Sequence, residues 1–458
     1  MTATAKRTNV LWMFGDQHRA QATGYLGDPN VTTPNIDRLA AEGVAFTSAV
    51  AGSPLCTPAR SAILTGCYPH RGAAAHEDQL PPDRSTIATP FRDAGYRTAY
   101  FGKWHLDGFH ERDGRGAMHI VPPERRGGFD TWVGYENNNS PWDSWVHGGT
   151  ADEAFHHRLP GYETDALTDL LIDYLATPDD DDAPFFAVLA PQPPHDPYVA
   201  PSEWMSRHTP GRVQLRPNVP DVPRVVERAR RELAGYYAQI ENLDWNLGRI
   251  REALAACGHA DDTHIVFFSD HGDLHGSHGQ FLKTAPWEEA VRVPLIVGGA
   301  APRYVHRFGR VTAPVNQVDL GPTSLGLCGI PVPSWMDGTD YSSLRLIDPA
   351  ETAPTVSAAA AYAVNRAALP DSAFAQIVVP TGHPDSVDRA WRAVITTDGW
   401  KYVALEGVPW LMFDLNDDPY ELVDLAHNTR YRDQRRRLHD RLGDWIRDTG
   451  DAFQLGTL

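Results

Sequence analysis

Four short apolar segments, each followed at once by polar residues, constrain the fold of this chain most. They span residues 9–14, 96–101, 185–190 and 264–269. Segments with a helical spacing of apolar residues separate them, and this alternation predicts a mostly parallel sheet with helices on both faces. Ligands of such open sheets bind outside the carboxyl ends of the strands. The sequence therefore predicts a functional site where the polar residues after these segments meet.

The residues that follow the four segments are of chemically useful types. In chain order they are Asp16 and Gln17, Lys103 and His105, His195, and Asp270 and His271. No one of these positions is persuasive alone, because each also suits the turn or cap that ends a strand. Their recurrence at four strand ends predicts one shared crevice.

The composition indicates a large globular protein that carries a net negative charge. The chain has 458 residues, 42% of them hydrophobic, which is enough to bury a sizeable core in one large domain with a smaller appendage. Its 41 basic and 59 acidic residues give a net charge of −18, which argues against nucleic acid or an anionic membrane as the general partner. An anionic substrate would need a local positive pocket.

Cysteine usage and the first residues favour a cytoplasmic location. The four cysteines are widely spaced without a CxxC pair, so neither a disulfide framework nor a zinc ribbon is expected. Residues 1–8 are polar and lead straight into the first apolar segment, and no later stretch is long enough to span a bilayer. We therefore predict a cytoplasmic protein in a reducing compartment.

Two further patterns divide the chain. Apolar residues three and four positions apart predict a long core-facing helix over residues 224–256. The pattern then changes near residue 366, which predicts a large α/β domain over 1–365 and a small α+β subdomain over 366–458. The elements expected in the subdomain are strands at 392–395, 400–403 and 410–414 and a helix at 430–445. We expect the acidic run at 179–182 to be a solvated loop.

The pentapeptide Cys56-Thr57-Pro58-Ala59-Arg60 places a thiol at the predicted start of a short helix, with a cation one turn further on. Thr57 can cap the helix, and Pro58 suits the first helical position. The orphan amides and positive dipole end of the helix would then favour a nucleophile or an anionic ligand at Cys56. The alternative is a buried free thiol at a helix cap, which the pentapeptide alone does not exclude.

Two carboxylates indicate a metal site. Asp16 and Asp270 suit a hard divalent cation, and each is followed by a neutral candidate ligand, Gln17 through its amide oxygen and His271 through a ring nitrogen. Taken singly, each pair fits a strand-terminating turn or a helix cap as well as it fits a ligand set. Together with Cys56, the two pairs favour the metal site.

In this order the motifs resemble those of the type I sulfatases, which belong to the alkaline phosphatase superfamily. That family carries an acidic pair after the first strand, a Cys-x-Pro-x-Arg block, Gly-Lys-x-His, Pro-His-x-Pro and a second acidic pair followed by a lysine. The corresponding residues here are Asp16-Gln17, Cys56 to Arg60, Gly102-Lys103-Trp104-His105, Pro194-His195-Asp196-Pro197, Asp270-His271 and Lys283. The resemblance extends over residues 9–425 and implies that superfamily's large, mostly parallel sheet sandwiched by helices.

The resemblance implies a sulfuric ester hydrolase that releases sulfate from a small organic sulfate ester. Cys56 would be oxidised to formylglycine by a separate formylglycine-generating enzyme. A thiolate would attack sulfur poorly and give a stable adduct, whereas an aldehyde hydrate supplies an oxygen nucleophile and a second hydroxyl that can expel sulfate. By resemblance, Arg60 and Lys103 would hold this nucleophile and His105 would assist its deprotonation.

The resemblance also implies the remaining site residues. His195 and Lys283 would bind sulfate and protonate the leaving oxygen. The ligands of a divalent cation would be Asp16, Gln17, Cys56, Asp270 and His271. Calcium is what the sulfatase resemblance implies. Many sulfatases have Asp-Asp and Asp-Asn at the two acidic pairs, so the amide and imidazole here also leave manganese or magnesium open.

Three hypotheses about function remain at this stage. The first is a sulfatase, and the second is a phosphonate monoester or phosphodiester hydrolase that uses the same formylglycine and metal. The third is a non-catalytic binding or scaffold protein, which retention of every site position disfavours. The aromatic and polar residues of 132–157 fit either a substrate-binding insertion or core and interface positions. The oligomeric state stays open, a homo-oligomer included.

Overall fold

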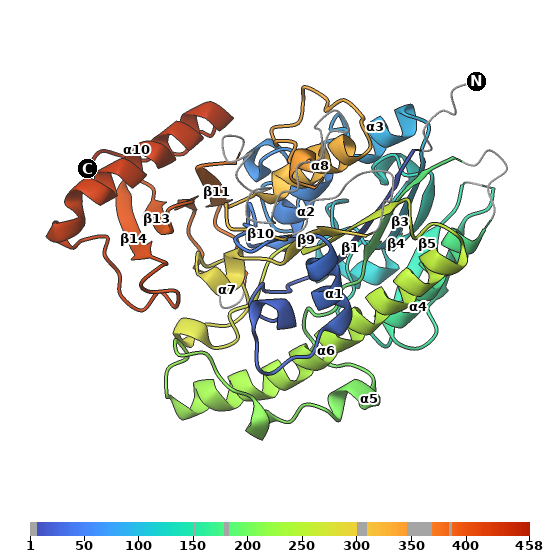
Figure 1. Ribbon diagram of the computed structural model, residues 1–458, viewed down its shortest axis with the longest axis horizontal. Helices are drawn as coiled ribbons and strands as arrows, with labels where there is room; N and C mark the ends of the chain where they lie inside the picture. The colour runs from blue at the N-terminus through green and yellow to red at the C-terminus, as the bar shows by residue number, and fades with distance from the viewer. Residues whose placement is uncertain (1–6, 151, 178–182, 300–308, 346–368, 384–386) are drawn as a thin grey trace, which may run out of the picture.

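The computed structural model describes residues 7–150, 152–177, 183–299, 309–345, 369–383 and 387–458. The predicted boundary between residues 365 and 366 and the acidic run at 179–182 lie outside these residues. The described part forms one large sheet between helices, with a smaller sheet and the C-terminal end of the chain to one side (Figure 1).

The large sheet has parallel strands at its centre, as predicted. Within the described residues its strands follow one another in the order β10 (Gly309–Val311), β2 (Val44–Phe46), β9 (Leu295–Gly298), β8 (Thr263–Ser269), β1 (Asn9–Gly15), β7 (Phe185–Ala190), β3 (Arg97–Lys103), β4 (Thr131–Tyr135), β5 (Trp145–Gly148) and β6 (Phe155–Arg158). The neighbours from β8 to β4 pair in parallel, while β9, β5 and β6 pair antiparallel. The four predicted apolar segments are confirmed as β1, β3, β7 and β8.

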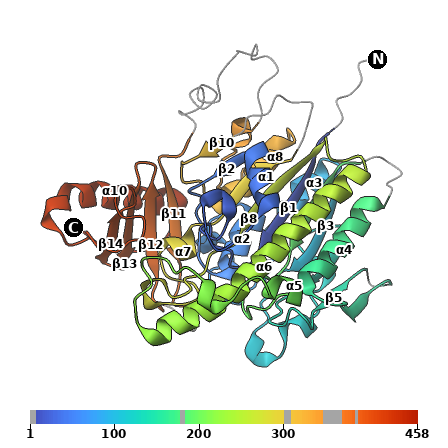
Figure 2. The ribbon, with the colours of Figure 1, turned by 60° about the horizontal axis from the view of Figure 1, so that its bottom comes forward.

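Helices cover both faces of this sheet (Figure 1 and Figure 2). On one face lie α1 (Pro34–Glu42), α4 (Glu163–Ala176) and α6 (Pro223–Ala256), and on the other lie α2 (Cys56–Thr65), α3 (Ala88–Asp93) and α8 (Leu320–Leu327). The short helices α5 (Ser202–Met205) and α7 (Glu288–Val291) lie in the connections. The helix predicted at 224–256 is α6, one residue longer at its start.

The two-residue period of β1 explains why both faces are covered. Leu11 and Met13 belong to the buried cluster that contains the apolar residues of α6. Trp12 points to the opposite face, where its ring centroid lies 5.1 Å from that of Phe186 and 5.4 Å from that of Phe268. A strand that is apolar at nearly every position must be buried on both sides, and every residue of β1 is buried.

The smaller sheet is antiparallel, in the order β11 (Ser372–Ile377), β12 (Trp391–Thr396), β13 (Trp400–Leu405) and β14 (Val408–Asp414). Helix α10 (Arg432–Thr449) packs on it. The three predicted strands are confirmed as β12, β13 and β14, and the predicted helix overlaps α10. Strand β11 was not predicted. None of the helices in the described ranges combines the length and the apolar character needed to cross a membrane.

The predicted cap of the cysteine helix is wrong. Helix α2 begins at Cys56 itself, with Leu55 at the N-cap position and no side chain capping it. Thr57 lies inside the first turn, where its hydroxyl accepts a hydrogen bond of 3.1 Å from the backbone N–H of Glu77. The cysteine therefore stands at the first helical residue, and Thr57 anchors a neighbouring loop.

Candidate active site

The structure brings the polar residues after β1, β3, β7 and β8 together at one edge of the sheet. Lys103 Nζ lies 2.7 Å from Asp16 Oδ2, and His271 Nε2 lies 3.5 Å from Asp16 Oδ1. From the other side, Lys283 Nζ lies 2.9 Å from His195 Nε2. This is the carboxyl edge of the parallel strands, where open α/β sheets bind their ligands.

Cys56 lies at the centre of this group. Its side chain is buried, with 1% of the residue exposed. Its sulfur lies 3.0 Å from Lys283 Nζ, 3.2 Å from His271 Nε2 and 3.6 Å from Asp16 Oδ1. A reactive group at this position would thus have a cation, an imidazole and a carboxylate in contact with it, and the N-terminal end of α2 behind it.

Arg60, one turn further along α2, ties the elements of the site together. Its Nη1 donates a hydrogen bond of 2.7 Å to the carbonyl oxygen of Lys103. Its Nη2 lies 3.3 Å from Asp16 Oδ2, and its Nε lies 3.1 Å from Asp270 Oδ2. Burial works to lower the pKa of Arg60, but Asp270 and Asp16 outweigh it and the pKa is raised. The guanidinium therefore stays charged in a fully buried position.

Asp16 is the carboxylate on which the cations converge. Burial works to raise its pKa, but Lys103, His195 and Arg60 together hold the pKa well below the ordinary value. The side chain is fully buried. Asp16 is therefore ionised, and its Oδ1 faces Cys56 and His271 while its Oδ2 is held by the cations.

One set of four side chains fits a divalent cation. The ligand atoms of Asp16, Cys56, Asp270 and His271 all lie within 4.8 Å of one another, and all four residues are buried. His271 Nδ1 lies 3.0 Å from the carbonyl oxygen of Gly272, which assigns the proton to Nδ1 and leaves the lone pair of Nε2 for a metal. Burial also lowers the pKa of His271, so the ring is neutral. Two carboxylates and a neutral imidazole suit a divalent cation.

Gln17 lies beside this set and joins it to the lysine. Its Oε1 accepts a hydrogen bond of 2.8 Å from Lys283 Nζ, and its Nε2 donates one of 2.5 Å to Asp273 Oδ2. Its backbone N–H donates to Asp270 Oδ1 over 3.0 Å. The amide oxygen predicted to be a ligand is thus occupied by an ammonium group.

Lys283 and His195 form a contact pair on the far side of Cys56. His195 Nδ1 lies 2.8 Å from the carbonyl oxygen of Asp196, so its Nε2 is the acceptor for Lys283. Burial works to lower the pKa of Lys283, but Cys56 and Asp16 outweigh it and the pKa is raised. Lys283 is therefore a fixed ammonium that donates to Cys56, Gln17 and His195 at once.

His105 follows β3 with a φ of 59°, in the left-handed region. Neither of its ring nitrogens has a hydrogen-bond partner among the described residues, although the ring is buried. Burial and the neighbouring Lys103 hold its pKa well below the ordinary value. His105 is therefore a neutral imidazole whose ring nitrogens remain available to a bound molecule.

Comparison with known protein families agrees with this geometry. The family profile of the sulfatases matches residues 8–330. The chain belongs to the sulfatase family. It is accordingly a sulfuric ester hydrolase, and its fold is the one that the resemblance implied.

Individual relatives cover nearly the whole of this sulfatase. The ulvan-active sulfatase of Formosa agariphila is 33% identical over 468 residues, which is 98% of this chain and 83% of that protein. The endo-4-O-sulfatase of Bacteroides thetaiotaomicron is 28% identical over 509 residues, covering 98% of this chain and 94% of that one.

Solved structures have the same fold. One concerned with glycosaminoglycan metabolism by Bacteroides thetaiotaomicron has a TM-score of 0.80 at 25% identity and covers 97% of both chains. The phosphonate monoester hydrolase of Agrobacterium radiobacter has a TM-score of 0.75 at 22% identity, covering 97% of this chain and 96% of that one, and shares the fold.

Sequence reasoning missed several residues that hold the sulfatase site in place. Asp273 accepts hydrogen bonds from Gln17 Nε2 and, over 2.6 Å, from the hydroxyl of Tyr198. Burial raises the pKa of Asp273 to about 6. The sequence signal that could have identified Asp273 is an acidic residue two positions after His271. Gln317 Nε2 donates to the carbonyl oxygens of Ser269 and Asp270, both at 2.6 Å, and no motif marks it.

The aromatic segment at 132–157 divides between the core and the surface. Trp132 is 4% exposed in β4, and Tyr135 and His147 are fully buried. Trp142, His156 and His157 are exposed instead, Trp142 to 46%. Trp132, Tyr135 and His147 are therefore core residues.

Two histidines after the second acidic pair support its loop. His275 Nε2 lies 3.4 Å from Asp273 Oδ2, and its ring centroid lies 4.3 Å from that of Tyr236. The ring of His278 stacks on Trp287 at 3.9 Å. Both contacts fix the loop that leads to Lys283.

Proposed function

We propose that this sulfatase hydrolyses a sulfate monoester to an alcohol and inorganic sulfate, with a nucleophile derived from Cys56. The observation that carries the proposal is the contact of Cys56 Sγ with Lys283 Nζ, His271 Nε2 and Asp16 Oδ1. Oxidised to formylglycine and hydrated, position 56 would supply an oxygen nucleophile and a route to release the sulfate. That oxidation requires a formylglycine-generating enzyme as a maturation partner.

The buried cations would hold the sulfate group. A sulfate monoester brings negative oxygens into a site where Arg60, Lys103 and Lys283 are fixed before it arrives. Fixed charges in a water-poor site stabilise developing negative charge more than mobile solvent does. Lys283, 3.0 Å from Cys56 Sγ, is best placed to contact the transferred group.

Two histidines would move the protons. His105 is neutral and has ring nitrogens without partners among the described residues, which suits a general base beside the nucleophile. His195 Nε2 and Lys283 Nζ lie 2.9 Å apart and can share a proton, so this pair would deliver a proton to the leaving alcohol oxygen. Ester hydrolysis needs both a base that activates the nucleophile and an acid that protonates the leaving group.

A divalent cation would be held by Asp16, Asp270, His271 and position 56. When bound, it would polarise the sulfate oxygens and lower the pKa of the nucleophile. We propose calcium, with manganese or magnesium as the alternatives that metal analysis separates. Gln17 would contribute by fixing Lys283, through the 2.8 Å contact of its amide oxygen.

A second candidate is a phosphonate monoester or phosphodiester hydrolase with the same site. The candidate ligands of the metal include the imidazole of His271, and the amide of Gln17 contacts Lys283 instead. A set with a nitrogen and few carboxylates is less specific for calcium, which favours this second candidate. The substrate in either case would be a small organic ester. The cytoplasmic location and the oligomeric state stay predictions.

A matched panel of esters tests the choice. Protein with Cys56 shown to be converted is assayed with 4-nitrophenyl sulfate and with 4-nitrophenyl phenylphosphonate, and Cys56→Ala is the control. We expect kcat/KM to be larger for the sulfate and both activities to vanish in the variant. A larger value for the phosphonate would replace the sulfatase proposal with the second candidate.

A further inference from the structure

His105 lies in a short loop whose backbone is fixed on both sides of it. Before His105, the backbone N–H of Trp104 donates a hydrogen bond of 2.8 Å to the carbonyl oxygen of Tyr135, which continues the pairing of β3 with β4. After it, the carbonyl oxygen of Leu106 accepts a hydrogen bond of 2.9 Å from the backbone N–H of Leu80. The position of the imidazole therefore depends on the backbone between these contacts.

One buried carboxylate holds the far end of this loop. Glu136 comes directly after β4, and its side chain is fully buried. Its Oε1 accepts hydrogen bonds of 2.8 Å and 3.1 Å from the backbone N–H groups of Asp107 and Gly108, and its Oε2 accepts one of 3.2 Å from that of Leu106. Three consecutive N–H groups after His105 therefore donate to the same carboxylate.

The backbone of His105 needs support of this kind. Its φ of 59° lies in the left-handed region, which costs a residue with a side chain free energy and persists where the surroundings impose it. Neither ring nitrogen has a hydrogen-bond partner among the described residues, so no hydrogen bond of the ring holds the residue in place. The hydrogen bonds of the neighbouring backbone groups therefore fix the direction of the ring.

A structural role for Glu136 is the alternative. The side chain of Asp107, in the turn that Glu136 holds, accepts hydrogen bonds of 2.5 Å from Arg125 Nε and 2.6 Å from His119 Nε2. Glu136 would then support the segment after the loop, whatever His105 does. The two roles differ in one respect, because an effect that passes through His105 must disappear when the imidazole is removed.

We propose that Glu136 is a positioning residue for His105, and that it fixes the turn at 106–108 so that the imidazole stays where it takes the proton of the nucleophile. The inference rests on the proposed function, which makes His105 the general base. Both oxygens of Glu136 accept from backbone groups, so this carboxylate acts on the reaction through the loop. A base that is displaced by about 1 Å loses up to about 100-fold in rate.

A double-mutant cycle tests the proposal in protein with converted Cys56, assayed with 4-nitrophenyl sulfate. In Glu136→Gln the shape is kept, but an NH2 group replaces one of the two accepting oxygens and faces at least one backbone N–H. We expect kcat to fall about tenfold and KM to change less than about twofold, because the cations that hold the sulfate group stay in place. His105→Ala should lower kcat about 100-fold or more.

The double variant gives the deciding value. We expect its kcat to equal that of His105→Ala within about twofold, because Glu136 has nothing to position once the imidazole is gone. Glu136→Asp, which keeps the charge and shortens the side chain, takes the place of Glu136→Gln in the cycle if that variant does not fold. The same direction is expected.

Asp244 provides a matched control. It is also a buried carboxylate that accepts backbone hydrogen bonds, in this case 2.9 Å from the N–H of Asn35 and 2.7 Å from that of Ile36 at the start of α1. Asp244→Asn should destabilise the fold and keep its kcat. The control therefore separates loss of a buried acceptor from loss of the contact that holds the loop of His105.

Each outcome bears on one claim. An unchanged kcat in the folded Glu136 variants overturns the proposal, and so does a further tenfold loss in the His105→Ala background, which would mean a structural effect by another route. A tenfold loss of kcat in Asp244→Asn overturns it as well. Full kcat in His105→Ala contradicts the role of His105 in the proposed function, and the role of Glu136 with it.

Discussion

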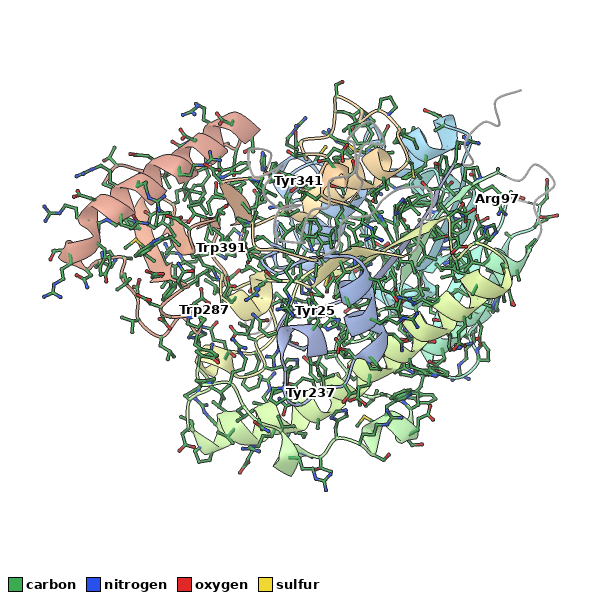
Figure 3. The ribbon with its side chains drawn as sticks, viewed as in Figure 1. Tyr25, Arg97, Tyr237, Trp287, Tyr341 and Trp391 are labelled. Atoms are coloured by element: carbon green, nitrogen blue, oxygen red, sulfur yellow. The ribbon has the colours of Figure 1, made fainter. Side chains whose placement is uncertain are left out.

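The indole Nε1 of Trp391, in the small C-terminal sheet, donates a hydrogen bond of 2.9 Å to the carbonyl oxygen of Thr284, the residue after Lys283. Thr284 has a φ of 74°, in the left-handed region, and Trp391 is fully buried. Lys401 Nζ adds a contact of 3.0 Å to the carbonyl oxygen of Pro286. Figure 3 places Trp391 at the junction between the small sheet and the rest of the molecule. The small sheet therefore holds the loop that carries Lys283.

We predict that Trp391→Phe lowers kcat by about tenfold, because the loop loses the donor that fixes it and Lys283 shifts relative to Cys56. The unpaired carbonyl should also destabilise the fold by about 1–3 kcal/mol. Stopped assays and urea unfolding measure the two effects. Trp400→Phe, in the neighbouring strand β13, is the control and should keep its kcat. Equal kcat values in both variants would mean that Thr284 needs no such support.

For Lys103 we predict a large loss of rate and a small loss of stability. Lys103→Ala removes a buried cation 2.7 Å from Asp16, while Arg60 still pairs with that carboxylate. Loss of one preorganised charge costs about 100-fold or more in kcat. The midpoint temperature of thermal unfolding should change little in comparison with this loss of kcat. A variant that unfolds, or that keeps its rate, would make Lys103 a structural residue.

Removal of one carboxylate tests the metal set. In Asp270→Asn the shape stays and the charge is lost, so we expect metal affinity to fall at least about 100-fold and turnover with it. The metal content of purified protein, measured by elemental analysis before and after chelation, gives the readout and identifies the ion. Asp417→Asn, in an exposed turn, is the matched control. Full metal content and full activity in Asp270→Asn would contradict the assignment.

The acid sensitivity of the fold should depend on His147. This buried ring accepts a hydrogen bond of 2.9 Å from the backbone N–H of Val121, and burial lowers its pKa from 6.5 to about 3. Below pH 6.5 the unfolded chain binds a proton that the folded chain does not, so the free energy of unfolding falls as the pH falls toward 3.

His147→Gln can accept the same N–H but does not titrate. We predict that the unfolding free energy of this variant falls less steeply between pH 6.5 and pH 4 than that of the wild type. The two slopes should differ by up to about 1 kcal/mol per pH unit. Urea unfolding at several pH values in this range gives the slopes. Parallel slopes for the two proteins would show that His147 binds its proton equally well in both states.

Strand ends were easier to predict than the contacts between them. The runs that became β1, β3, β7 and β8 are mostly apolar and short, and together with the helical segments between them they predict buried parallel strands. The cluster around Cys56 followed from the motif order, since each polar pair stands directly after a strand. The cap at Thr57 failed because the loop with Glu77 competes for its hydroxyl, a contact twenty positions away.

Residues that act through the tertiary structure left no trace in the sequence. Gln317 and Trp391 reach the site from segments without a motif, and only the packing of α8 and the small sheet brings them there. The ring centroids of His76 and His383 lie 5.6 Å apart, although the two residues are about 300 positions apart in the chain. Such contacts are set by the fold as a whole.

The mass of the proteolytic peptide that contains Cys56 shows whether this residue is converted to formylglycine. The protein is co-expressed with a formylglycine-generating enzyme, and a known sulfatase is treated in parallel. We predict a peptide in which the thiol side chain is replaced by an aldehyde, together with sulfate release that Cys56→Ala abolishes. An unmodified thiol, under conditions that convert the control sulfatase, would contradict the formylglycine mechanism.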